Sequence, residues 1–112
     1  MIRRSGENIS ADEVERALLL HPGVRLAAVI GVPDEIRGEE VEAFVVPADG
    51  ADPTPDELAE HCAAKLAYFK VPRYWKVVDE LPMTASERVA KGRLKSADPL
   101  AGAYDRVARA WL

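Results

Sequence analysis

Two almost wholly apolar stretches, residues 25–32 (RLAAVIGV) and 41–47 (VEAFVVP), constrain the fold of this chain more than any other feature. Short apolar runs rich in β-branched residues are typical of strands that are buried on both faces. Between them, the polar stretch PDEIRGEE (33–40) predicts a long loop. We therefore expect residues 25–46 to form a hairpin within a sheet.

Two helix starts are marked by capping boxes, SADE (10–13) and TPDE (54–57). In such a box the first side chain accepts a hydrogen bond from the backbone of the fourth residue. Pro55 supports the second start, because proline is favoured at the first helical position. The apolar residues that follow at helical spacing are Val14, Ala17, Leu18, Leu58, Cys62 and Leu66. Each helix should therefore bury one face against the sheet.

Further elements complete the predicted order. Residues 2–4 and 74–81 favour strands, and Pro72 disfavours a helix immediately before it. The tail over 98–112 carries apolar residues at helical spacing, which predicts a packed terminal helix. Those residues are Leu100, Tyr104, Val107 and Trp111. The expected fold class is α/β (α+β), a small mixed β-sheet flanked by helices.

Composition limits the function. The chain has 112 residues, enough for one domain, and a net charge of −4 that argues against a general nucleic-acid binder. No stretch is long enough for a membrane span, and the N-terminus has no signal-peptide pattern. Cys62 is the only cysteine, so no internal disulfide can form. Its place in the apolar stripe predicts a core residue rather than a reactive thiol, and a reducing cytosol is expected.

The stretch LPMTASERVAKGRLK (81–95) concentrates positive charge in an acidic chain, with four cations between residues 88 and 95. Such a cluster could hold a small anion such as a nucleotide phosphate. The sequence contains no nucleophile with a base and an orienting group, no glycine-rich phosphate loop and no convincing metal-ligand spacing. The domain is therefore not expected to catalyse a reaction alone.

Four segments together resemble a known family: residues 2–15 (IRRSGENISADEVE), 21–46, 54–82 and 84–94 (TASERVAKGRL). They are similar to the C-terminal domain of the acyl-adenylate-forming (AMP-binding) superfamily. Within it, GENIS and YFKVPR are most similar to fatty-acid and carnitine-type CoA ligases, a group of acyl-CoA synthetases. The resemblance covers residues 2 to about 95 and implies that residues 1–95 form the mobile C-terminal lid domain. It does not cover residues 96–112, for which the helical spacing of the apolar residues predicts a helical tail packed on the lid.

The resemblance implies a reaction and its participants. These ligases convert a carboxylic acid, ATP and CoA into acyl-CoA, AMP and pyrophosphate through an acyl-adenylate. A large N-terminal domain binds ATP, Mg²⁺ and the acid, and the lid rotates between two poses. This chain would be a cytoplasmic lid, inactive without that partner domain. The acyl substrate is not encoded here, because its pocket lies in the N-terminal domain.

For CoA, the resemblance implies two surfaces, of which the first faces the pantetheine arm. Gly6, with Ser5 and Glu7, matches the turn that lines the pantetheine tunnel, although a plain turn glycine is the alternative. Arg37 stands where some relatives place a tunnel tryptophan, and arginine does not provide the same apolar wall.

The second surface would bind the nucleotide end of CoA. Phe69 matches an aromatic residue that stacks on the CoA adenine, and Arg73 matches a basic residue near the CoA phosphates. Lys70 lies between them and would add positive charge. The structural alternative for Phe69 is packing against Pro72.

Arg88 corresponds to the family's adenylation lysine. That lysine stabilises charge on the substrate carboxylate and α-phosphate, and a glycine precedes it where this chain has Glu87. Three alternatives follow. Arg88 serves as the cation in an adjusted site, Lys91 replaces it by a register shift, or adenylation is weak. An arginine keeps the charge but is wider and planar.

The sequence also allows two functions other than that of a CoA ligase lid. The chain could be the lid of an enzyme that loads a carrier protein's phosphopantetheine, in which case the nucleotide-binding residues would be unnecessary. Alternatively, it could be a stand-alone or degenerate non-catalytic module, which the replacement of lysine by Arg88 would favour.

Overall fold

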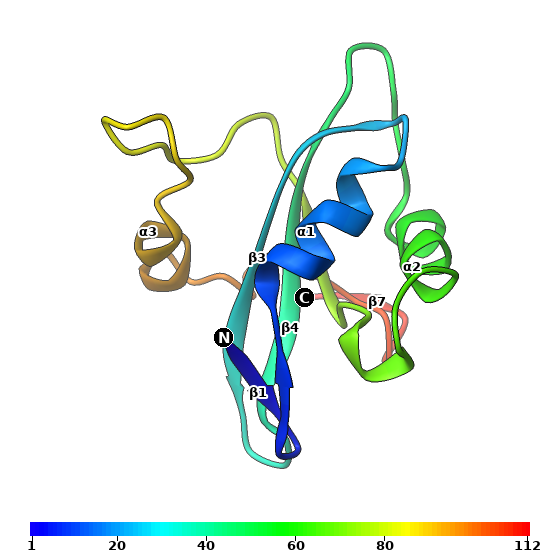
Figure 1. The fold of residues 1–112 in the computed structure, drawn as a ribbon, viewed down its shortest axis with the longest axis vertical. Helices are drawn as coiled ribbons and strands as arrows, with labels where there is room; N and C mark the ends of the chain where they lie inside the picture. The colour runs from blue at the N-terminus through cyan, green and yellow to red at the C-terminus, as the bar shows by residue number, and fades with distance from the viewer.

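The hairpin predicted over residues 25–46 lies at the centre of the structure, a computed structural model that describes residues 1–112. Strands β3 (Val24–Asp34) and β4 (Gly38–Pro47) pair antiparallel from Val24↔Pro47 to Asp34↔Gly38, as Figure 1 shows. The prediction of a long loop over 33–40 is wrong, because only residues 35–37 connect the strands. The carboxylate of Asp34 accepts hydrogen bonds from the backbone of Ile36 and Arg37 and closes a tight turn.

The remaining strands build a mixed sheet around β4. They are β1 (Ile2–Arg4), β2 (Glu7–Ile9), β5 (Tyr74–Val77), β6 (Tyr104–Asp105) and β7 (Ala110–Trp111). The sheet has seven strands in the order β2-β1-β4-β5-β6-β7, and β3 also pairs with β4. Strand β5 runs parallel to β4, whereas the other pairings are antiparallel. The predicted fold class, a small mixed sheet with helices, is confirmed.

Both predicted helix starts are confirmed. Helices α1 (Ala11–Leu19) and α2 (Pro55–Ala63) begin where the Ser10 and Thr54 side chains accept backbone hydrogen bonds, at 3.4 and 3.2 Å. A 3₁₀ turn, η1 (Tyr68–Lys70), and a short helix, α3 (Lys91–Ser96), were not predicted. No helix is long and apolar enough to cross a membrane.

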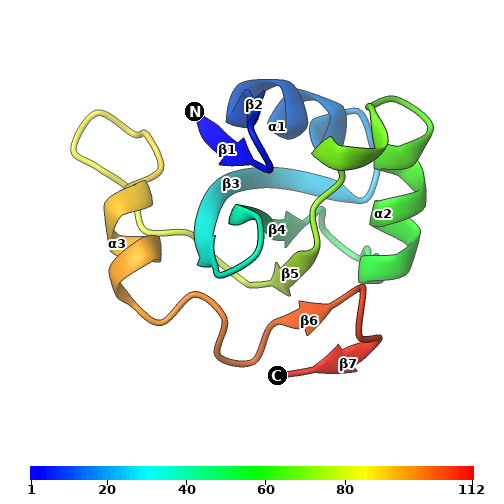
Figure 2. The same cartoon turned by 90° about the horizontal axis from the view of Figure 1, so that it is seen from below.

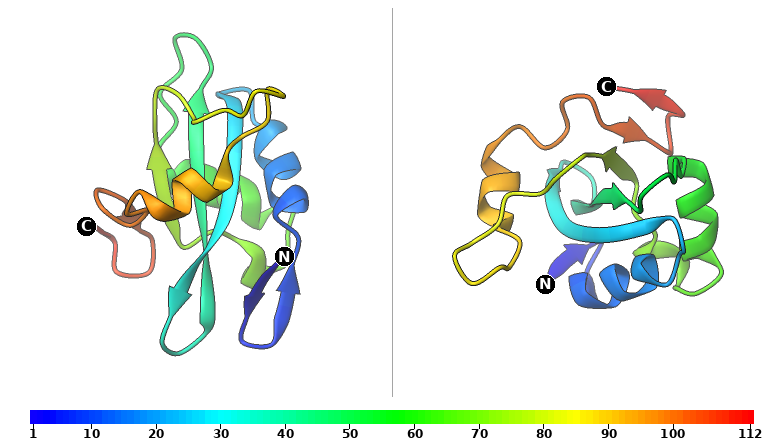
Figure 3. Two further views of the ribbon diagram at one scale, coloured as in Figure 1. Left: turned by 90° about the vertical axis from the view of Figure 1, so that its left-hand side faces the viewer. Right: turned by 90° about the horizontal axis from the view of Figure 1, so that it is seen from above.

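The two faces of the sheet carry separate cores (Figures 2 and 3). Helices α1 and α2 cover one face, where Trp75 is completely buried, and α3 lies over the other, where Phe44 and Leu94 meet. Cys62 belongs to the first core, as the sequence predicts, and burial raises the pKa of its thiol to about 11.

The predicted helix over 98–112 is wrong. Tyr104 and Asp105 instead add β6 to the free edge of β5, and β7 folds back on β6. Pro99 and Gly102, the latter at φ +74°, make this segment a poor helix. Pairing with β5 gives hydrogen-bond partners to the backbone N–H and C=O groups along the edge of β5, which would otherwise lack them. This gain outweighs the preference for a helix that the spacing of the apolar residues indicates.

Candidate functional site

The turn between β1 and β2 contains Ser5 and Gly6, both in the left-handed region at φ 51° and 83°. Space around Gly6 is open, so its conformation rather than crowding favours glycine. The backbone N–H of Ser5 donates to the Arg37 carbonyl at 2.8 Å, and the Arg37 guanidinium donates to Ser5 Oγ at 3.2 Å. The structure therefore brings Ser5, Gly6 and Arg37 together at one end of the sheet, with Glu7 exposed beside them.

In η1, neighbouring aromatic residues have different environments. Phe69 is half-buried and packs against the first core, whereas the side chain of Tyr68 is 84% exposed. Their rings meet edge to face at 5.7 Å. Stacking of Phe69 on a base remains a prediction, and Tyr68, which the sequence reasoning did not select, is the aromatic ring that solvent reaches.

Lys70 and Arg73, the predicted phosphate-binding cations, already have carboxylate partners. Lys70 Nζ lies 2.8 Å from Glu13 Oε1. Arg73 makes two hydrogen bonds of 3.0 Å to Asp105 and one of 3.3 Å to Glu40. The Arg73 hydrogen bonds hold the pKa of Asp105 below its usual value. A phosphate at either cation would therefore have to compete with a carboxylate.

Arg88 ends a tight turn that projects away from the sheet (Figure 1). The turn is closed by hydrogen bonds from Glu87 N to Thr84 O (3.0 Å) and from Thr84 N to Arg88 O (2.7 Å). The hydroxyl of Thr84 also accepts from Arg88 N at 3.2 Å. Val89 forms an isolated bridge with Met83, so the turn is a small hairpin. The Arg88 side chain is exposed. Its backbone is fixed, because both its N–H and its carbonyl form hydrogen bonds with Thr84.

Glu87 takes the left-handed conformation, with φ 62°, which is the reason a glycine suits this position. We expect Glu87→Gly to stabilise the domain by about 0.5–1 kcal/mol, because it relieves the strain of a side chain at positive φ. Urea unfolding of the two proteins measures the difference. Glu87→Ala is the matched control, since alanine removes the charge and keeps the strain. An equal gain from both variants would contradict the backbone explanation.

Lys91, the alternative adenylation cation, begins α3 and has a structural partner. Its Nζ lies 2.8 Å from Glu15 Oε2 on α1. The same oxygen accepts a hydrogen bond from the backbone of Val29 at the edge of β3, also at 2.8 Å. The Glu15 carboxylate thus joins α1, β3 and the start of α3, and a register shift that extended Lys91 from the turn would break this link.

Other features were missed by the sequence reasoning. Glu42 is fully buried in β4, and neither carboxylate oxygen has a hydrogen-bond partner. A charged residue inside the apolar run VEAFVV was the available signal. Arg106 and Arg109 were hidden by the wrong prediction of a helical tail, since they lie in the connection between β6 and β7. No group of three or more His, Cys, Asp or Glu side chains is placed to hold a metal ion.

Solved structures with the same fold define the class of protein. The crystal structure of acyl-CoA synthetase from Brucella canis matches with a TM-score of 0.82 and 43% identity, over 86% of this chain and 18% of that one. The amide bond synthetase McbA from Marinactinospora thermotolerans matches with a TM-score of 0.81 and 40% identity, over 85% of this chain and 19% of that one. The fold is that of the small C-terminal domain of adenylate-forming enzymes.

The sequence comparisons identify the family. The family model for the AMP-binding enzyme C-terminal domain matches residues 13–88. A feruloyl-CoA synthase from Amycolatopsis is 46% identical over 95 residues, which are 85% of this chain and 19% of that protein. The chain belongs to the AMP-binding enzyme C-terminal domain family. It spans less than a fifth of the length of the curated relatives it matches first.

Proposed function

We propose that this chain is the lid of an ATP-dependent acyl-CoA synthetase. Its partner would be an N-terminal adenylation domain that binds ATP, Mg²⁺ and a small carboxylic acid. The two-domain enzyme would form an acyl-adenylate with release of pyrophosphate, and then transfer the acyl group to the CoA thiol with release of AMP. Relatives that carry the names of CoA ligases and synthetases support this proposal. A cytoplasmic location is part of it.

One observation carries the proposal. The Ser5–Gly6 turn and the Arg88 turn project from different parts of the domain, toward opposite ends of its long axis in Figure 1. A rigid domain cannot present both turns to one reaction centre at the same time. Rotation of the whole lid between two poses would bring each turn to that centre in its own half-reaction.

In the adenylation pose, Arg88 would contribute a positive charge. Its guanidinium is exposed on a turn whose backbone is fixed by the hydrogen bonds to Thr84. A cation held in place before the reaction stabilises the charge that develops on the carboxylate and α-phosphate oxygens without reorganisation. Arg88 can donate two parallel hydrogen bonds to such oxygens.

In the thioester-forming pose, the turn around Gly6 would lie along the pantetheine arm. A Cβ placed at Gly6 would meet no atom within 4 Å, so a flexible arm can pass close to the backbone of this residue. Arg37 would flank the arm, because its guanidinium is hydrogen-bonded to Ser5. Its methylene groups would give the arm less apolar contact than a tryptophan in this place.

A second candidate is the lid of an adenylating enzyme whose acyl acceptor is not free CoA. The pairing of Lys70 and Arg73 with carboxylates favours it, since these cations are less available to CoA phosphates. The similarity to the amide bond synthetase McbA, whose name specifies a different product, points the same way. A carrier-bound phosphopantetheine is one such acceptor.

A chimeric enzyme tests the proposed function. This chain replaces the C-terminal domain of the Brucella canis acyl-CoA synthetase, and the same enzyme without any C-terminal domain is the control. We expect the chimera to restore both acid-dependent ATP–pyrophosphate exchange and acyl-CoA formation above the truncated enzyme. Restored exchange without acyl-CoA would support the second candidate. A chimera that folds, by circular dichroism, but is no more active than the truncated enzyme in either assay would exclude both.

A further inference from the structure

The segment over residues 79–97, which carries the cationic turn and α3, has a single polar tie to the rest of the domain. Its backbone hydrogen bonds stay within the segment, as in the bond of 2.7 Å from Ala90 N to Pro82 O. Its side chains also form no hydrogen bond to residues outside it. One ion pair, with 2.8 Å between Lys91 Nζ and Glu15 Oε2, joins the segment to the domain.

Apolar contacts hold this segment on the second core without fixing its direction. Leu81 and Leu94 are buried there, and Val89 packs partly against the same core. Burial of apolar area is non-directional, so these contacts alone would allow the segment to tilt on the sheet. Lys91 lies one turn before Leu94 on α3, and its ion pair gives this short helix a second, directed contact.

Glu15 is a rigid anchor for the ion pair. It lies on α1, where its neighbour Val14 is completely buried in the first core. The same Oε2 atom accepts a hydrogen bond of 2.8 Å from the backbone N–H of Val29, in the central strand β3. Only 16% of the Glu15 side chain is exposed, so water and salt screen it less than a surface carboxylate. The ion pair therefore ties Lys91 to the sheet.

The connection from Lys91 to Arg88 is short and stiff. The hairpin over residues 82–90 is closed by backbone hydrogen bonds of 2.7 Å at its base and near its tip. Arg88 is three residues from Lys91, a separation of no more than about 10 Å even in extended chain. A tilt of α3 would therefore move the Arg88 guanidinium with it.

From these contacts, and resting on the proposed function, we propose that Glu15 and Lys91 are positioning residues for the adenylation half-reaction. They set the direction in which the domain presents Arg88 to the carboxylate and α-phosphate, and they touch neither group. Lys91 acts through Arg88 rather than in its place. An ion pair that is partly open to solvent contributes little to stability, whereas a small misplacement of a reacting group costs much in rate.

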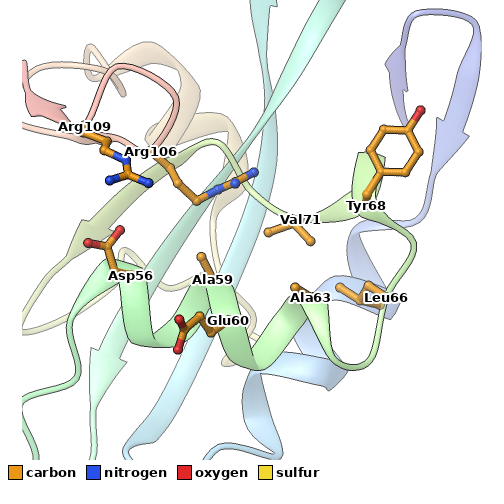
Figure 4. Close-up of a pocket in the computed structure, with 9 residues that line it drawn as sticks. All are labelled: Asp56, Ala59, Glu60, Ala63, Leu66, Tyr68, Val71, Arg106 and Arg109. Carbon is orange, nitrogen blue, oxygen red and sulfur yellow. The ribbon is translucent and has the colours of Figure 1, made fainter.

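Double electron–electron resonance on the 112-residue chain tests the position of the turn without an assay of activity. Nitroxide labels are attached at Ser86→Cys, in the exposed turn, and at Glu60→Cys on α2. Glu60 is exposed at the wall of an open cavity, where a label has room (Figure 4). Cys62 is fully buried and stays unlabelled. We expect one narrow distance distribution, and a broader one after Glu15→Gln, which can still accept the hydrogen bond from Val29.

The chimeric enzyme gives the second measurement. Glu15→Gln should lower the kcat of acid-dependent ATP–pyrophosphate exchange about tenfold and leave the KM values for ATP and acid unchanged, because misplacement affects the chemical step. Thioester formation from a supplied acyl-adenylate should not change. Lys91→Met should have the same effect, and the double variant should be no worse than either single variant. Lys91→Arg should keep the rate within about twofold, because arginine can retain the ion pair.

Glu13→Gln is the matched control. It removes an ion pair of the same length, 2.8 Å, from the same helix, but the partner is Lys70, which lies outside the segment over 79–97. This variant should leave both the distance distribution and the exchange rate unchanged. Equal effects of Glu13→Gln and Glu15→Gln would show a general effect of charge on α1 and would overturn the inference.

Other outcomes would also overturn it. One is an unchanged distance distribution after both Glu15→Gln and Lys91→Met, and another is a broader distribution with full exchange activity. Exchange that rises after Glu15→Gln would show that Lys91, once released, is itself the adenylation cation. A chimera that is inactive with every variant would exclude the proposed function and the role in adenylation with it, while the distances would still show whether the ion pair fixes the turn.

Discussion

Replacement of Arg88 by alanine in the chimeric enzyme is expected to lower acid-dependent ATP–pyrophosphate exchange by roughly 10²–10³-fold. The reason is the loss of a pre-positioned positive charge at the developing oxyanion. Alanine leaves the turn intact, because the hydrogen bonds of residue 88 come from its backbone. Thioester formation from a supplied acyl-adenylate should change little, since the proposed function assigns that step to the Gly6 turn.

Arg88→Lys distinguishes the alternatives for this position. If Arg88 serves adenylation, lysine should keep the exchange rate within about tenfold, because both side chains carry the charge but differ in shape. Lys95→Ala is the control for the loss of an exposed cation from the same basic stretch, and it should have no effect. Exchange that appears only after lysine is introduced would contradict the proposed role and favour a lid that has lost its first half-reaction.

Replacement of Glu42 by leucine is expected to stabilise the domain by about 2–4 kcal/mol at pH 8. Glu42 is fully buried between Ile30 and Tyr74 on the neighbouring strands, and its carboxylate has no hydrogen-bond partner. Loss of hydration raises its pKa to about 8, and the charge of Lys76 offsets only part of this effect. Leucine removes the cost of burying the carboxylate and keeps a similar volume.

The shift in the Glu42 pKa also predicts the pH dependence of stability. The folded-state pKa of about 8 lies above the ordinary value of 4.5, so the folded state binds the proton more tightly than the unfolded state. The contribution of Glu42 is therefore most favourable below pH 4.5. It declines as the pH rises to about 8 and is constant above that.

Urea unfolding between pH 5 and pH 9 measures this dependence. Glu42→Gln, which cannot ionise, should remove most of the decline, although its buried amide still costs stability. Glu80→Gln is the control, because Glu80 is an exposed carboxylate in a loop. If the unaltered chain and Glu42→Gln lose stability with the same slope, the buried carboxylate is not the cause.

Local interactions made much of the fold predictable. Ser10 and Thr54 cap helices through residues three positions away, and Cys62 falls on an apolar stripe that a single helix defines. The apolar runs around Val29 and Val45 predicted the central hairpin, because burial on both faces leaves few other arrangements. The candidate turns at Gly6 and Arg88 were also accessible, since both are short segments whose residues hydrogen-bond within or next to the turn.

The errors lie where distant segments compete. The tail has the apolar spacing of a helix, but the edge of β5 offers it backbone hydrogen bonds that no local pattern encodes. The same long-range pairing brings Asp105 to Arg73, which converts a predicted phosphate-binding residue into an ion-pair partner. Lys70 and Lys91 are likewise engaged by carboxylates far away in the chain, Glu13 and Glu15.

The sequence alone therefore determined the hairpin, the two capped helices, the buried cysteine and the turns that carry Gly6 and Arg88. These depend on side-chain periodicity and on hydrogen bonds between near neighbours. Only the tertiary structure decided which cations remain free. Whether an arginine binds a ligand or a carboxylate depends on which charged groups the sheet brings within hydrogen-bond distance, and those groups lie tens of residues apart in the chain.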